Sequence, residues 1–335
     1  MHCDPRVFSS CLVFVLGFFL SPTLVLAIDS EETVRVGAWN IEWLGFPEKR
    51  SSFGRDTPQK PSTVAKYIHD CGVDILALEE IGVDSLETPY SSSQLQAIFD
   101  AMKKDYGQTW EYLLFPKTEY DNGTEDWRTR GQHCGVAWRT DKVTRNGDFY
   151  AVPVGKNEKF GIKFFERRAN AVKFSLGSGK TDLVVVPVHL KSNRADDKEK
   201  DPNYTAKQRQ AELTSFVSQL ETLKTHFKDE DIVLLGDTNI MTGERKTSDI
   251  LVDAGFIDLN SSDDGTTVAW GKSKYPSAPF DRSFVPKDQP EFKISAQKTH
   301  KPDDVEKMKD HRRQLSDHYL VSFDLTVMAD DDGTP

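Results

Sequence analysis

Short apolar runs alternate with helix-like segments along nearly the whole chain, and this alternation restricts the fold to classes that combine sheets with helices. The expected strands are residues 34–38, 74–78, 135–138, 171–176, 183–188, 232–235, 283–285 and 319–325, and the expected helices are residues 61–69, 94–106 and 206–227. The run at 232–235 is wholly apolar, so we expect it at the centre of a sheet. Because no internal repeat or long linker interrupts the pattern, the sequence predicts one α/β domain with sheets inside and helices outside.

The composition argues against two classes of protein, polytopic membrane proteins and proteins that coat nucleic acid. The 335 residues include 43 Lys+Arg and 53 Asp+Glu, which gives a net charge of −10. The mean hydropathy of −0.54 argues against a polytopic membrane protein. The acidic balance argues against a protein that coats nucleic acid by bulk charge, but not against an enzyme that meets phosphate through a bound cation.

The first 27 residues resemble a secretory signal peptide. Arg6 precedes an apolar run over residues 7–20, and Val25 and Ala27 occupy the small-residue positions of a cleavage site. We therefore expect residues 1–27 to be removed and the protein to be exported, to the extracellular space or the periplasm; the alternative is an uncleaved anchor. Residues 28–328 would then form the domain, and the acidic tail at 329–335 is expected to be disordered.

Two cysteines, Cys71 and Cys134, remain after this cleavage. Export permits a disulfide between them, but two cysteines far apart in the sequence are weak support for one. Two buried thiols are the simpler expectation.

Polar residues of the kinds that handle metals and phosphate follow several of the expected strands. They are Asn40 and Glu42, Glu79 and Glu80, His189, Asp237 and Asn239, and the Ser316-Asp317-His318 triplet. Each group alone has an ordinary explanation, such as a turn, a polar cap or a structural histidine. Their joint appearance at strand ends indicates a site, because sites on α/β scaffolds collect where strand ends meet.

The ordered motifs Gly37-Ala-Trp-Asn40-Ile-Glu, Leu76-Ala-Leu-Glu-Glu80-Ile, Pro187-Val-His189-Leu-Lys-Ser, Leu235-Gly-Asp237-Thr-Asn239, Phe280-Asp281-Arg282 and Ser316-Asp317-His318 resemble those of the endonuclease/exonuclease/phosphatase superfamily. The resemblance spans residues 34–325 and implies the deoxyribonuclease I-like fold. That fold is a four-layer sandwich in which two packed mixed β-sheets are flanked by helices. It also implies a metal-dependent phosphoesterase.

The resemblance assigns roles residue by residue. The implied metal-binding residues are Asn40, Glu80 and Asp317. The implied catalytic residues are Asp237 and Asn239, which orient water and phosphate, His318, which handles the proton, and Asp281, which orients His318. The implied phosphate-contacting residues are His189, Asn239 and Arg167. One departure is Gln132, which stands where deoxyribonuclease I has a glutamate that supports the first histidine.

The chemistry of these residue types agrees with the assignment. Mg²⁺ prefers oxygen ligands and keeps several waters, so one or two carboxylates suffice to hold it. An imidazole exchanges protons near neutral pH, and a carboxylate behind it fixes its tautomer. We expect Mg²⁺ or Mn²⁺ as the cofactor, with Ca²⁺ as a further option.

The substrate class stays open between three readings. We favour a secreted nuclease that prefers DNA to RNA, acts as a monomer and has no stable membrane association. The nucleic-acid substrate is favoured because four basic residues follow His189 and could track a phosphate backbone: Lys191, Arg194, Lys207 and Arg209. The alternatives are a sphingomyelinase-like or inositol-polyphosphate phosphatase-like enzyme and a catalytically silent binding module. The motif after Asp237 lacks the Asn-Tyr-Arg continuation of the inositol phosphatases, and no basic amphipathic segment points to a lipid surface.

Overall fold

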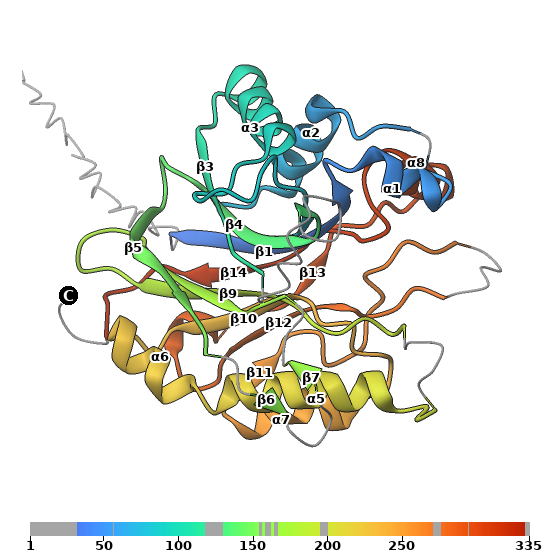
Figure 1. Cartoon of the computed structure of the whole chain (residues 1–335). Helices are drawn as coiled ribbons and strands as arrows, with labels where there is room; N and C mark the ends of the chain where they lie inside the picture. Colours follow the sequence, from blue (N-terminus) through green and yellow to red (C-terminus); the bar gives the residue numbers. More distant parts are fainter. Residues whose placement is uncertain are drawn as a thin grey trace, which may run out of the picture. The chain divides into compact units, whose positions relative to one another are not determined.

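Two six-stranded mixed sheets pack face to face, and helices cover the outer face of each (Figure 1). The computed structural model describes residues 32–55, 57–117, 130–153, 156–157, 162–163, 167–194, 200–270, 276–293 and 295–331. By internal contacts the chain divides into Met1–Glu31 and Glu32–Pro335, and all described residues lie in the second unit. The expected signal peptide lies outside them, and the predicted four-layer sandwich is confirmed.

The first sheet has the order β13-β14-β1-β2-β4-β3. Its strands are β1 (Thr33–Leu44), β2 (Ile75–Ile81), β3 (Trp110–Leu114), β4 (His133–Arg139), β13 (Lys298–Thr299) and β14 (Val321–Thr326). The second sheet has the order β11-β12-β10-β9-β8-β5. Its strands are β5 (Thr144–Ala151), β8 (Asn170–Ser175), β9 (Asp182–His189), β10 (Ile232–Asp237), β11 (Phe256–Asp258) and β12 (Asp281–Pro286). A separate two-stranded sheet joins β6 (Lys156–Asn157) and β7 (Ile162–Lys163).

Each large sheet contains one parallel pair, β1 with β2 in the first and β9 with β10 in the second. All other neighbours in these sheets are antiparallel. As predicted, β10 is an interior strand, with β9 on one side and β12 on the other. The carboxyl ends of a parallel pair lie at the same edge of its sheet, so each pair delivers two strand ends to one place.

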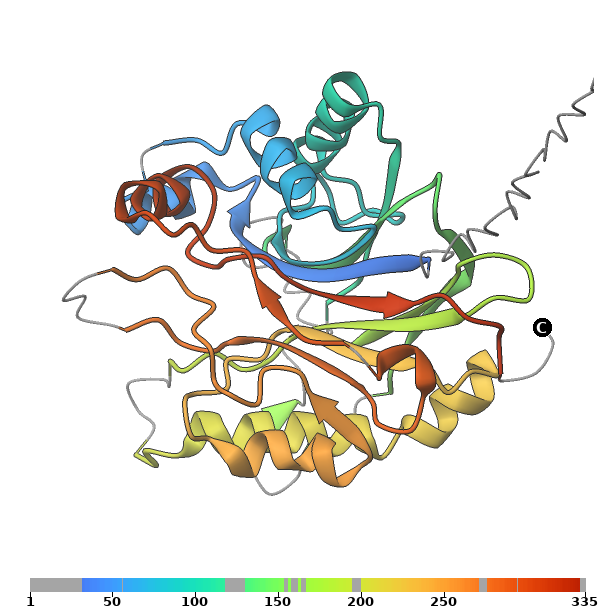
Figure 2. The same cartoon turned by 180° about the vertical axis from the view of Figure 1, so that it is seen from behind.

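Three apolar clusters hold the layers together. One lies between the sheets and includes Val36, Ala77, Val185 and Leu235. The second packs α2 (Pro61–Cys71) and α3 (Ser93–Tyr106) on the first sheet, and the third packs α5 (Tyr204–Val217), α6 (Leu220–Phe227) and α7 (Arg245–Asp253) on the second. Figure 2 shows the same layers from behind. The short helix α1 (Pro47–Ser52) and α8 (Val305–Gln314) lie near one end of the first sheet.

The single helix expected over residues 206–227 is two helices, α5 and α6, with a break at Ser218 and Gln219. The Ser218 hydroxyl donates to the carbonyl oxygen of Ser215 at 2.7 Å. A serine that bonds the preceding turn in this way competes with the helical hydrogen bonds. The apolar stripe continues across the break, so the pattern alone does not reveal it.

Cys71 and Cys134 are free, buried thiols that belong to different apolar clusters. Burial raises the pKa of Cys71 to about 12 and raises the pKa of Cys134 further above its ordinary range. The start of the expected acidic tail is held in place, because Ala329 forms an isolated bridge with Lys180. Residues 332–335 lie outside the described part of the chain.

Candidate active site

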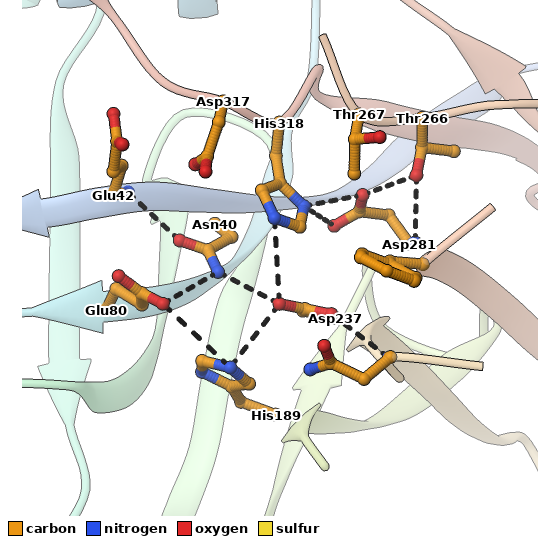
Figure 3. Close-up of polar contacts among 12 residues, drawn as sticks. Asn40, Glu42, Glu80, His189, Asp237, Thr266, Thr267, Asp281, Asp317 and His318 are labelled. Carbon is orange, nitrogen blue, oxygen red and sulfur yellow. Dashed lines mark hydrogen bonds and ion pairs between the residues drawn. The ribbon is translucent and has the colours of Figure 1, made fainter. Parts of the chain in front are cut away.

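The two parallel strand pairs bring polar side chains from both sheets to one place (Figure 3). Asn40 on β1 lies opposite Glu79 in the register, one residue before Glu80 on β2. Asp237 at the end of β10 is the register partner of both His189 on β9 and Asp281 on β12. The pairing of these five strands, together with the segment just before β14, thus joins residues that are nearly 280 positions apart in the sequence.

Four residues at or just after the ends of these strands have the left-handed backbone conformation, which most residues other than glycine avoid. Glu42, Trp43, Glu80 and Asn239 all have positive φ values, between 47° and 61°. The pairing of β1 with β2 shifts register between Asn40 and Leu44. Strain of this kind collects at functional sites, where the surrounding structure holds it.

His318 forms a buried dyad with Asp281. The His318 Nδ1 atom lies 2.8 Å from Asp281 Oδ2, and that oxygen also accepts a hydrogen bond from the Thr266 hydroxyl at 2.6 Å. Burial disfavours the charged ring, but the charges of Asp281 and Asp237 outweigh it and hold the pKa of His318 well above its ordinary value. The ring is therefore cationic at neutral pH, with its free nitrogen, Nε2, 3.8 Å from Asp237 Oδ2.

The pKa of His189 is shifted in the opposite direction to that of His318. Burial first, and then the charge of Arg167, lower the pKa of His189 well below its ordinary value. Its Nε2 atom lies 3.3 Å from Asp237 Oδ2, and because the ring is neutral this close contact is not an ion pair. Two histidines around one carboxylate thus differ in charge, which separates a proton donor from a neutral neighbour.

Asn40, Glu80 and Asp237 form the acidic centre of the site. The Asn40 amide nitrogen donates to Glu80 Oε1 at 3.2 Å and to Asp237 Oδ2 at 3.0 Å. Burial and the charges of Asp317 and Asp237 raise the pKa of Glu80 to about 7, and burial also raises the pKa of Asp237. These carboxyls carry more negative charge than their surroundings neutralise.

This donor set fits a divalent cation. The excess negative charge at Glu80 and Asp237 is what a cation would offset, and carboxylate oxygens suit Mg²⁺. The Asn40 oxygen accepts a hydrogen bond from the Glu42 backbone N–H at 2.9 Å, so Asn40 would have to turn its amide over to offer this oxygen to a cation. A different group, Asp237, Asp281 and His318, has ligand atoms within 4.8 Å of one another. We favour Glu80 and Asn40 as the metal side, because the His318 Nδ1 atom and both Asp281 oxygens are already engaged with each other.

Asp317 lies at the edge of the site, and its side chain is 37% exposed. Its Oδ2 atom lies 3.3 Å from Nη1 of Arg312, and the same nitrogen lies 3.0 Å from Glu42 Oε1. Glu42 is buried and also pairs with Arg55 at 3.1 Å. Glu42 ends the first of the six motifs, but the resemblance assigned it no role, and the arginines lie outside the motifs.

Arg167 and Asn239 support the site through backbone carbonyls. Arg167 donates to the carbonyl oxygens of His189 and Leu190, and Asn239 donates to the latter as well. Gln132 hydrogen-bonds Arg167 at 3.3 Å and Glu80 at 3.5 Å, and its described hydrogen bonds do not include His189. Arg167 and Asn239 still line the cavity, so both are placed to meet a phosphate there.

The cavity has a volume of about 420 Å³. It contains all the expected site residues except two buried ones, Asn40 and Asp281, which act from behind its wall. Its lining residues include Glu42, Arg55, Glu80, Arg167, His189, Arg194, Asp237, Asn239, Arg312, Asp317 and His318. The indole nitrogen of Trp39, which is fully buried, donates to the carbonyl oxygen of His318 at 3.1 Å and so fixes that residue from below.

Glu79 lies beneath the site, fully buried between the two sheets. Neither of its carboxyl oxygens has a hydrogen-bond partner among the described residues, and burial, followed by the charges of Asp281 and Asp237, raises its pKa well above the ordinary value of 4.5. Gly236 makes room for it, since a Cβ atom at that position would lie 2.6 Å from Glu79 Oε1. The native structure therefore favours the protonated form of Glu79 more than the unfolded chain does.

Glu79→Gln is expected to remove a pH-dependent cost of folding. The unfolded chain releases the Glu79 proton above pH ~4.5 while the native state retains it, so wild-type stability falls as pH rises above that value. Denaturant unfolding should show the variant gaining about 1–3 kcal/mol on the wild type between roughly pH 5 and 8. Glu111→Gln, at an exposed position of β3, is the matched control; an equal trend in both variants would contradict the account of Glu79.

The similarity of this chain to known proteins is found in its fold. No family model matches the sequence, and the search of curated proteins gave no match. Among solved structures, an endonuclease/exonuclease/phosphatase from Beutenbergia cavernae superposes with a TM-score of 0.58 and 18% identity, over 88% of this chain and 71% of that one. The chain has the endonuclease/exonuclease/phosphatase fold.

Two further structures agree with this assignment. The endonuclease/exonuclease/phosphatase from Bacteroides vulgatus gives a TM-score of 0.59 at 15% identity, over 89% of this chain and all of that one. The human Nocturnin catalytic domain with bound sulfate gives 0.53 at 14% identity, over 88% and 94% of the two chains. The superfamily resemblance carried by the six motifs is therefore confirmed at the level of the fold, and the roles of individual residues rest on the site geometry described above.

Proposed function

We propose that this protein is a divalent-metal-dependent phosphodiesterase that hydrolyses nucleic acid, with DNA as the first substrate and RNA as the second. The observation that carries the proposal is that a proton donor and a group of metal-binding side chains lie in one cavity. The cationic His318–Asp281 dyad faces Asp237 from one side, and the Asn40–Glu80 pair contacts it from the other. A proton donor and a cation site around one carboxylate are what phosphodiester hydrolysis requires.

Glu80, Asn40 and Asp317 would hold Mg²⁺ or Mn²⁺, and the ion when bound would neutralise charge on the phosphate. Asp237 orients the attacking water and accepts its proton as the new phosphorus–oxygen bond forms. Its raised pKa makes it a better base than an ordinary aspartate. His318 gives its Nε2 proton to the oxygen that leaves, and Asp281 stabilises the ring through that transfer. Arg167, His189 and Asn239 hold the phosphate oxygens in place.

Four arginines line the cavity, and this supports a polyanionic substrate. They are Arg55, Arg167, Arg194 and Arg312. The basic cluster expected after His189 is reduced, because Arg209 is buried and pairs with Glu244 at 2.7 Å, while Lys207 pairs with Asp201. Arg194 therefore remains the member of that cluster that the structure places on the cavity wall.

A substrate panel tests this proposal against its rivals. The protein without residues 1–27 would be assayed on plasmid DNA, RNA, sphingomyelin and inositol phosphates with Mg²⁺ or Mn²⁺. We expect DNA to be cut. Hydrolysis of sphingomyelin or an inositol phosphate with DNA and RNA intact would move the substrate class to the runner-up, and no hydrolysis of any phosphoester would favour the silent binding module.

Cleavage of DNA should also weaken as salt rises from roughly 50 to 200 mM, since contacts to flanking phosphates release counterions. Replacing both Lys191 and Arg194 with glutamine should lower the slope of log KM against log salt by about 1 for each lost phosphate contact. Lys207→Gln, whose lysine already pairs with Asp201, is the control. A wild-type enzyme indifferent to salt would count against a substrate that extends beyond the scissile phosphate.

We further propose that the protein is exported after removal of residues 1–27 and acts as a monomer. Among the described residues, no helix has the length and apolar character needed to cross a membrane. Mass spectrometry of the protein recovered outside the producing cell would show whether its first residue is Ile28.

A further inference from the structure

A second hollow of about 820 Å³ adjoins the catalytic cavity. The residues that line both spaces are Arg194, Phe280, Arg312, Asp317 and His318. Arg167, His189, Asp237 and Asn239, which surround the expected phosphate position, line only the catalytic cavity. The second hollow therefore borders the catalytic cavity at His318, Arg194 and Arg312.

Arg312 keeps donors available at this boundary. Its Nη1 atom serves both Glu42 and Asp317, at 3.0 and 3.3 Å. Within the described ranges its Nε and Nη2 atoms make no hydrogen bond, although a guanidinium has five N–H donors. A planar fork held at one corner, with its other donors free, suits a phosphate.

Glu42 fixes the position of this fork. Its side chain is buried, and its carboxylate pairs with Arg312, with Arg55 at 3.1 Å and with Arg50 at 3.5 Å. Arg50 in turn donates to the carbonyl oxygens of Leu315 and Arg313, which follow or end α8. Since Glu42 Oε1 accepts a hydrogen bond from Arg312 and Oε2 faces Arg50 at ion-pair distance, Glu42 acts on the substrate through Arg312 and is a positioning residue.

Part of the wall of the second hollow is apolar and aromatic, and Thr242, Thr267 and Ser277 add hydroxyl groups. Its lining includes Met241, Val268, Trp270, Pro276 and Phe280, and Met241 is 44% exposed. Large apolar side chains at a surface hollow beside a charged site suit a ligand with a flat apolar part, and bases stack on aromatic side chains. Arg194 and Arg312 carry a charge like that of a phosphocholine headgroup, and Asp317, the acidic residue in the same lining, is paired with Arg312.

We propose that this hollow binds the nucleotide that adjoins the scissile phosphate on the His318 side. Arg312 and Arg194 bind the outer phosphate of that nucleotide, its base lies against the apolar wall, and Glu42 positions Arg312. This inference rests on the proposed nuclease function and deepens it, because it makes hydrolysis depend on a second phosphate. The substrate is then a strand with consecutive phosphates and not an isolated phosphodiester.

The test compares dithymidine monophosphate, which has one phosphodiester, with the same compound carrying an added 5′- or 3′-terminal phosphate. In the wild type, one of the two added phosphates should raise kcat/KM by about tenfold or more, as expected for hydrogen bonds to a charged group. The gain should fall below threefold in Arg312→Gln, in Arg194→Gln and in Glu42→Gln. Because the gain is a ratio within each variant, a general loss of activity cancels.

Arg313→Gln is the matched control. It neighbours Arg312 on α8, but its side chain is 59% exposed and pairs with Asp310. The control should keep the full gain. No gain in the wild type, or an undiminished gain in both Arg312→Gln and Arg194→Gln, would overturn the subsite, and a full gain in Glu42→Gln alone would remove the positioning role.

Cleavage of plasmid DNA distinguishes a failure of the proposed subsite from a failure of the proposed nuclease function. If the wild type cuts plasmid DNA with Mg²⁺ but gains nothing from either terminal phosphate, the subsite is wrong and the nuclease function stands. If it leaves DNA and RNA intact and hydrolyses sphingomyelin, both are wrong.

Discussion

His318→Ala is expected to lower kcat for DNA cleavage by about 10²–10⁴-fold, the usual cost of removing general acid–base catalysis. The fold should survive, because His318 lies just before β14 and outside the three apolar clusters. His226→Ala, at an exposed position of α6, is the matched control and should retain full activity. Activity within a few-fold of the wild type for His318→Ala would show that the proton passes elsewhere, and His189 would be the next residue to replace.

The partner variant Asp281→Asn tests how the dyad works. Asp281 raises the pKa of His318, so without its charge the ring loses its proton at lower pH. Since His318 must be protonated to act as the acid, the alkaline limb of the pH–rate profile should move to lower pH. A profile that keeps the wild-type limb would contradict the assignment of His318 as the acid.

Glu80→Gln is expected to lower kcat/KM by at least about 10³-fold, because charge stabilisation by a metal ion amounts to several kcal/mol. The amide keeps the size of the side chain but loses the charge that holds the cation. Glu111→Gln on β3 is the control for loss of one surface carboxylate.

Thermal unfolding gives an independent measure of the same site. Mg²⁺ should raise the Tm of the wild type and not that of Glu80→Gln, since a ligand stabilises only the state that binds it. Without metal, we expect Glu80→Gln to have a higher Tm than the wild type at alkaline pH. The pKa of Glu80 is raised from 4.5 to about 7, so the wild type loses stability as pH rises through this window and the variant does not. Equal Mg²⁺ shifts in both proteins would place the cation elsewhere.

The grouping of the site residues could be predicted because they stand at the ends of short apolar strands, and their individual roles stay predictions. Asn40, Glu80, His189 and Asp237 all leave parallel strands, and the pairing of those strands brings them together. The apolar pattern shows where each strand ends, but the joining of the two sheets around Asp237 required the superfamily resemblance. Asp281 is the clearest case, since only the register of β12 on β10 places it behind His318.

Other parts of the structure lacked a signal that the sequence could carry. The strands β3 and β5 are edge strands with exposed faces, so neither has the continuous apolar run of β10. The role of Glu42 depends on three arginines from α1, α8 and the segment after α1, and no local pattern joins them. Gln132 was expected beside His189, and its contact with Arg167 instead follows from backbone placement at the start of β4.

The central claim is that this cavity hydrolyses phosphodiesters with the help of a divalent cation, and the most direct measurement is DNA cleavage in the presence and absence of chelator. Protein treated with excess chelator should leave plasmid DNA intact, and added Mg²⁺ or Mn²⁺ should restore cleavage in the wild type but not in Glu80→Gln. Full cleavage by the wild type in excess chelator would contradict the account.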